Sequence, residues 1–95
     1  MKMVRGKEQV LADGTLNQIQ LALEQERNQA VVRKENVAAF KERKKAFARI
    51  ATYSRELLNC LYPYSQERTL EMAQMLGNME KELGEIEQEQ LQRMK

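Results

Sequence analysis

Apolar residues recur every three or four positions over much of the stretch from Thr15 to Tyr62, and this spacing is typical of an amphipathic helix. The stretch holds no glycine and no proline, the two residues that most often interrupt a helix. Thr15 and Gln18 match the T-x-x-Q form of a capping box, in which each of the two residues satisfies a free backbone N–H group. We therefore predict a long helix over residues 15–62 that begins at Thr15.

A second helix is predicted over residues 65–94, after a turn at the only proline, Pro63. Proline disfavours helical geometry at the residue before it, so the first helix has to end there. Ser65 is a suitable N-terminal cap for the second helix. The apolar positions of this helix alternate steps of four and three residues, which makes a heptad seam along one face. The seam consists of Met72, Leu76, Met79, Leu83, Ile86 and Gln90.

Two glycines, Gly77 and Gly84, lie inside the second helix. Each lowers helix stability by about 1 kcal/mol relative to alanine. They are seven residues apart and therefore lie on the same side of the helix. Two interpretations follow: a weak helical position tolerated on a solvent-facing side, or a smooth strip that another helix can approach closely.

A turn centred on Pro63 makes the two helices antiparallel and determines which residues face each other. Phe47 then lies opposite Met79, and Phe40 opposite Ile86, so that apolar residues meet along the hairpin. The charges agree, because a basic run on the first helix faces an acidic run on the second. The two runs are Lys41, Arg43, Lys44 and Lys45 on one side and Glu80, Glu82, Glu85 and Glu87 on the other.

The sequence therefore predicts an all-α helical hairpin over residues 15–95, preceded by a flexible arm of residues 1–14, which has no sustained periodicity. In this hairpin residues 16–30 have no intrachain partner, and two helices alone bury too little surface to be stable. We favour a second copy of the chain that completes a bundle or coiled coil, because two-fold dimers are the commonest closed assemblies. The alternative is a break near residues 25–36, where the periodicity is poor, giving a three-helix bundle.

Composition supports an all-α protein, and we expect it to be cytoplasmic. Charged residues make up 32% of the 95 residues and aromatic residues only 5%, while helix-forming residues dominate. The single cysteine, Cys60, excludes an internal disulfide and fits a reducing compartment. No window is apolar enough for a membrane span, and residues 1–14 lack the apolar run of a secretory signal.

The sequence carries no pattern of a catalytic, metal or cofactor site. It has no histidine, which removes the commonest general base and metal ligand. Cys60 has no obvious activating neighbour, and we expect it to be a small buried apolar side chain. The glutamates of the second helix lack the Glu-x-x-His pairs of di-metal bundles, and there is no glycine-rich phosphate loop. We therefore predict no enzyme activity, no metal, no cofactor and no small-molecule substrate.

Positive charge is concentrated in one segment, although the net charge is only +2. Residues 41–55 hold six basic residues and one acid, whereas residues 56–95 hold eight acids and four basic residues. Five of these cations form a helical stripe that could lie against nucleic-acid phosphates; we favour the other interpretation, in which the stripe pairs with the acidic second helix. The basic stripe consists of Lys41, Lys44, Lys45, Arg49 and Arg55.

These observations predict a non-enzymatic helical interaction protein, such as a small adaptor, chaperone or anti-factor regulator, that acts through protein–protein contact. Its partners would be a second copy of the chain and another protein. The expected interface combines the unmatched face of the first helix with an adaptable methionine strip of the second: Leu16, Ile19, Leu23, Met72, Met75 and Met79. The alternative function is a small nucleic-acid-binding accessory protein that uses the basic stripe.

Overall fold

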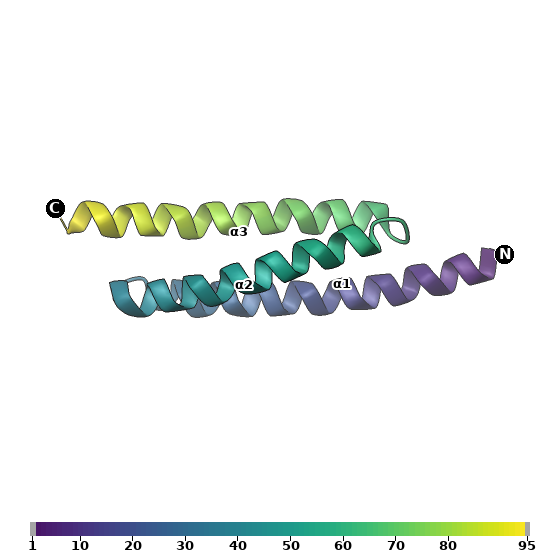
Figure 1. Ribbon diagram of the computed structural model, residues 1–95, viewed down its shortest axis with the longest axis horizontal. Coiled ribbons are helices and arrows are strands. Elements are labelled where there is room, and N and C mark those ends of the chain that lie inside the picture. The colour runs from purple at the N-terminus through teal and green to yellow at the C-terminus, as the bar shows by residue number, and fades with distance from the viewer. Residues whose placement is uncertain (1, 95) are drawn as a thin grey trace.

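Three helices account for nearly all of the described chain (Figure 1). The computed structural model describes the backbone of residues 2–94 and the side chains of residues 6–94. The helices are α1 (Lys2–Val31), α2 (Val37–Leu61) and α3 (Gln66–Arg93). α1 and α3 run in the same direction, and α2 runs antiparallel to both and crosses them obliquely. The result is a slender three-helix bundle with extents of 61 × 16 × 16 Å.

The long first helix is broken between Val31 and Val37, so the prediction of one continuous helix over residues 15–62 is wrong. The three-helix bundle with a break near residues 25–36 is confirmed. Asn36 begins α2, because its side-chain Oδ1 accepts a hydrogen bond from the Ala39 N–H at 3.1 Å. The break allows α2 to fold back along α1.

The fold-back covers the face of α1 that a simple hairpin would leave without a partner. Leu16 and Leu23 have no exposed surface, and they belong to the same core cluster as Phe40 and Phe47 of α2 and Leu76 of α3. The expectation that this face needs a second chain is therefore wrong. One chain supplies all three walls of its own core.

α1 begins at Lys2, so the segment expected to be an arm is helical from residue 2 to residue 14. The core spacing of this helix extends back to Ala12, which is buried. Thr15 does not cap a helix; its hydroxyl donates a hydrogen bond to the Leu11 carbonyl at 3.2 Å. Asp13 is tied to the turn between α2 and α3, because its Oδ1 accepts a hydrogen bond from the Ser65 hydroxyl at 2.6 Å. These packing and hydrogen-bond contacts carry the helix past Gly14.

The heptad seam predicted for the second helix is the buried face of α3. Five of its members are buried, and Ile86 is partly buried against the core. Gln90, the polar member, donates a hydrogen bond from Nε2 to the Lys34 carbonyl at 2.6 Å. This bond satisfies a buried amide and fixes the connection between α1 and α2. The buried members are Met72, Leu76, Met79, Leu83 and Gln90.

α2 presents a mixed face to the core. Phe40, Phe47 and Leu58 are buried, and Ser54 lies among them. Lys44 extends along the seam and ends in an ion pair with Glu87 at 2.8 Å, as its long aliphatic stem allows. Two polar residues, Lys44 and Ser54, thus interrupt an otherwise apolar face.

Replacing Phe47 by alanine should lower the free energy of unfolding by about 3–5 kcal/mol, because the ring is 2% exposed and leaves a cavity between the three helices. Urea denaturation followed by circular dichroism measures this loss. Tyr53→Ala on the outer side of the same helix is the matched control, since Tyr53 is 63% exposed and its truncation should change stability by no more than about 0.5 kcal/mol. Equal losses for the two variants would contradict this core.

Candidate interaction surfaces

The interface residues expected from the sequence lie inside the bundle. Five of the six are buried in the core, and Met75 is partly buried against it. Their side chains hold the helices of one chain together and are not available on its surface. An interface therefore has to be sought among other residues. The five buried residues are Leu16, Ile19, Leu23, Met72 and Met79.

The basic stripe is divided into a paired and an unpaired part. Arg55 forms an ion pair with Glu80, and Lys44 forms one with Glu87. The other three cations are exposed and make no ion pair with any described residue. Pairing with the acidic helix, the interpretation favoured from the sequence, thus holds for only two members. The unpaired cations are Lys41, Lys45 and Arg49.

Part of the charge pairing expected between α2 and α3 goes to α1 instead. Arg43 of α2 donates to both carboxylate oxygens of Glu26 on α1, at 2.9 and 3.0 Å. Glu82 of α3 pairs with Arg27 of α1 at 3.1 Å. These contacts form because α1 lies beside both α2 and α3. The two-helix hairpin predicted from the sequence did not place a third helix there.

The Arg55–Glu80 pair is a two-point ion pair between α2 and α3. The guanidinium donates to both oxygens of the carboxylate. This hydrogen bonding lowers the pKa of Glu80 below its usual value of 4.5, although partial burial opposes the shift. The same bonds raise the pKa of Arg55. The pair joins the C-terminal half of α2 to the middle of α3.

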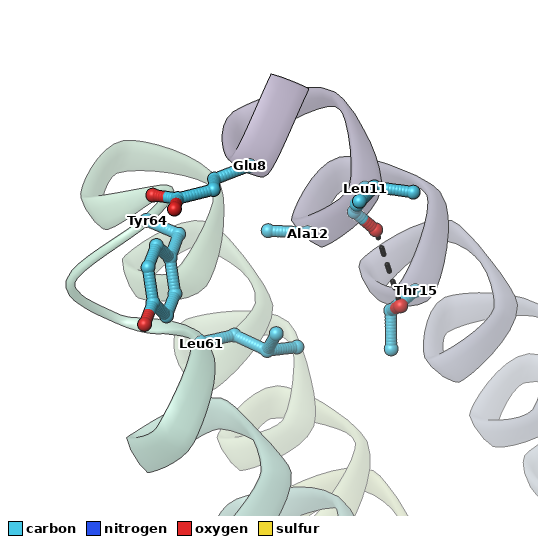
Figure 2. A pocket seen from close by; sticks show the side chains of 6 residues that line it. All are labelled: Glu8, Leu11, Ala12, Thr15, Leu61 and Tyr64. Carbon is cyan, nitrogen blue, oxygen red and sulfur yellow. Dashed lines mark hydrogen bonds between the residues drawn. The ribbon is translucent and has the colours of Figure 1, made fainter. Parts of the chain in front are cut away.

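An open hollow of about 240 Å³, which we call the turn-end notch, lies where α1 passes the turn between α2 and α3 (Figure 2). Leu11 and Ala12 of α1 line one side, and Leu61 and Tyr64 line the other. Glu8 stands over the opening, on the Tyr64 side. Thr15 completes the lining. The notch therefore offers an apolar surface with one carboxylate at its rim.

Large apolar side chains around the notch are exposed. Leu11 is 71% exposed, and Tyr64 is 48% exposed. The neighbouring backbone is held by Ser65, whose hydroxyl binds Asp13 and whose carbonyl accepts a bond from the Thr69 hydroxyl at 2.6 Å. The notch is thus formed by well-supported elements rather than by a loose loop.

Sequence reasoning missed the notch because it treated residues 1–14 as an arm. The adjacent apolar pair Val10 and Leu11 was a signal, and so was Tyr64 directly after the proline. Neither signal is sufficient alone, because the notch exists only if α1 is helical past Gly14 and runs alongside the turn.

Other chemical features are sparse. Cys60 is exposed, contrary to the expectation of a buried side chain, because it lies on the outer side of α2. Within the described part of the chain, no group of three or more potential ligand residues is placed to hold a metal ion. No described helix is long and apolar enough to cross a membrane.

Comparisons with protein-family models, with curated proteins and with solved structures find no match for this chain. The fold and its surfaces therefore carry the functional argument.

Replacing Glu80 by glutamine should destabilise the protein at neutral pH by less than about 1 kcal/mol, because both partners of the ion pair are partly exposed. The carboxyl pKa is lower in the folded chain than in the unfolded chain, so the pair stabilises the fold above pH 4.5. This contribution disappears as the pH falls through the folded-state pKa. Urea denaturation of both proteins between pH 7 and pH 3 should show the difference shrinking; a difference that grows in acid would contradict the ion pair.

Proposed function

We propose that the protein is a cytoplasmic, non-enzymatic interaction protein of the adaptor, chaperone or anti-factor type, which acts by contact with another protein at the turn-end notch. The observation that carries this proposal is the pair of exposed apolar side chains, Leu11 and Tyr64, that line the notch. Other residues form the buried core, so these exposed side chains contribute no packing to it. A second copy of the chain also remains an expected partner.

The notch favours a particular kind of ligand segment. Its walls are apolar, and the Glu8 carboxylate stands at its rim (Figure 2). A segment that presents a large apolar side chain beside a lysine or arginine would fill the hollow and pair with Glu8. A short amphipathic helix of another protein meets this requirement.

A photo-cross-linking amino acid at position 11 should give one discrete adduct in an extract of the source cells, whereas the same probe at position 21 should not. Leu21 is the matched control because it lies on the same helix and is 67% exposed. An excess of unlabelled wild-type protein should compete for the adduct, and an excess of a Leu11→Glu, Tyr64→Glu variant should not. Equal adducts from both positions, or no adduct from position 11, would contradict the proposal.

A second candidate function is the binding of nucleic acid by the unpaired part of the basic stripe. Lys41, Lys45 and Arg49 follow one another at steps of one helical turn on the outer side of α2, and no described carboxylate pairs with them. Tyr53 lies one turn further and is 63% exposed, so that its ring could stack on a base. The small net charge of +2 makes this the weaker candidate.

If the stripe binds phosphates, affinity for duplex DNA should fall roughly 40-fold between 50 and 200 mM salt, as three phosphate contacts require. Changing Lys41, Lys45 and Arg49 together to glutamine should remove this binding. The control changes Lys7, Lys34 and Arg93 to glutamine, which removes the same charge from other exposed positions. A titration by fluorescence anisotropy decides the question: equal loss in both triple variants would leave only non-specific charge attraction.

A further inference from the structure

The connection between α1 and α2 stays close to helical geometry. It comprises residues 32–36 and holds neither glycine nor proline. The Val32 N–H still binds the Asn28 carbonyl at 3.0 Å, as in a continuous helix, and the next turn is closed by bonds to carbonyls three positions back. Asn36 has extended backbone angles, with φ −113° and ψ 104°. No described residue has a positive φ angle. The chain therefore bends here without any residue that forbids a helix.

Two side-chain hydrogen bonds favour the bent connection. The Asn36 Oδ1 accepts a bond from the Ala39 N–H at 3.1 Å, which begins α2 as a separate helix. The Gln90 Nε2 donates to the Lys34 carbonyl at 2.6 Å. In a continuous helix this carbonyl would instead accept the N–H of residue 38. Gln90 is the polar member of the otherwise apolar seam of α3, so the core holds a buried amide at the bend.

We propose that this connection is a hinge, at which α1 and α2 join into one helix and two copies of the chain exchange α1. A change at Asn36 to helical angles gives one helix from residue 2 to residue 61, about 90 Å long. α2 and α3 stay together at the turn after Leu61. α1 then packs on the α2–α3 pair of the second copy, and two-fold symmetry repeats the exchange for the other α1.

A second copy is the specified partner because it supplies the surfaces that already cover α1 within one chain. Leu16 and Leu23 leave water completely in a core cluster shared with α2 and α3. After exchange the same residues of the other copy complete this cluster, and the ion pair between Arg43 and Glu26 forms between chains. These residues are not on the surface of the folded chain, and opening of the hinge is how a second copy reaches them.

The exchange does not rest on the proposed function. The turn-end notch lies between α1 and the turn that joins α2 and α3. It is kept after exchange, with its walls supplied by two copies. Loss of partner binding at the notch and loss of the exchange are therefore separate results.

The first test measures mass by sedimentation equilibrium over a range of protein concentrations. Asn36→Ala removes the cap and favours a continuous helix, and a dimer contains two hinges. Dimerisation should therefore become at least about tenfold tighter than in the wild type. Gln90→Leu removes the bond to Lys34, keeps the seam apolar and should act in the same direction.

The matched control is Asn78→Ala, which makes the same change at an exposed position inside α3. It should leave dimerisation at the wild-type level. Circular dichroism checks that all variants remain helical. If both hinge variants are monomeric at every concentration, or if the control tightens the dimer equally, the proposal is wrong.

The second test identifies the contacts that form between chains, in the Asn36→Ala background. One preparation carries Glu26→Arg and the other Arg43→Glu, so each copy alone places like charges at this contact. Exchange between the two preparations brings opposite charges together in both halves of the dimer. Native mass spectrometry of the mixture should therefore show the mixed dimer above its statistical share.

The control mixture carries Arg55→Glu in one preparation and Glu80→Arg in the other. Arg55 and Glu80 belong to α2 and α3, so their contact stays within one chain after exchange. The charge changes are the same in size and sign, which matches any attraction from net charge. The control should give a smaller share of mixed dimer, and equal shares in the two mixtures would overturn the exchange of α1.

Discussion

The bundle depends on the burial of one face of α1 against the other two helices. Leu16 and Leu23 leave water completely, and Phe40 and Phe47 of α2 are at most 2% exposed. Burial of such a side chain contributes about 1.5–3 kcal/mol, whereas an exposed ion pair contributes at most about 1 kcal/mol. Apolar contact therefore determines that the chain folds back after Val31, and the interhelical ion pairs adjust to that arrangement.

Features set by local chemistry could be read from the sequence, and features set by tertiary packing could not. Pro63 ended α2 close to the expected place, and the heptad seam of α3 is its buried face. The sequence located the break only to a broad polar segment. Asn36 caps α2 with a hydrogen bond to the Ala39 N–H, but this bond specifies the start of a helix only when α2 has a surface to pack on. The helical start of α1 was missed, because Ala12 and Asp13 are held there by contacts with distant parts of the chain.

The candidate surfaces show the same division. Periodicity identified the apolar faces of Leu16 and Met72, but an amphipathic pattern does not say whether the same chain or another covers a face. Folding covers both. The basic stripe is visible in the sequence, but only the fold separates Arg55, which has a carboxylate partner, from Lys45, which has none among the described residues. Candidate functional residues are therefore those that remain exposed and unpaired after the core has formed.

At Gly77 and Gly84 neither helix propensity nor the packing of the chain explains the residue. Each lowers helix stability by about 1 kcal/mol relative to alanine, and the space above both would accept a methyl group without any contact. Neither has the positive φ angle that would require glycine. Folding of a single chain therefore gives no reason for either residue. An isolated exposed leucine is ordinary, but Leu70 and Leu91 continue the same line at the same spacing. These four residues therefore leave a flat, partly apolar line along α3 that the core does not use.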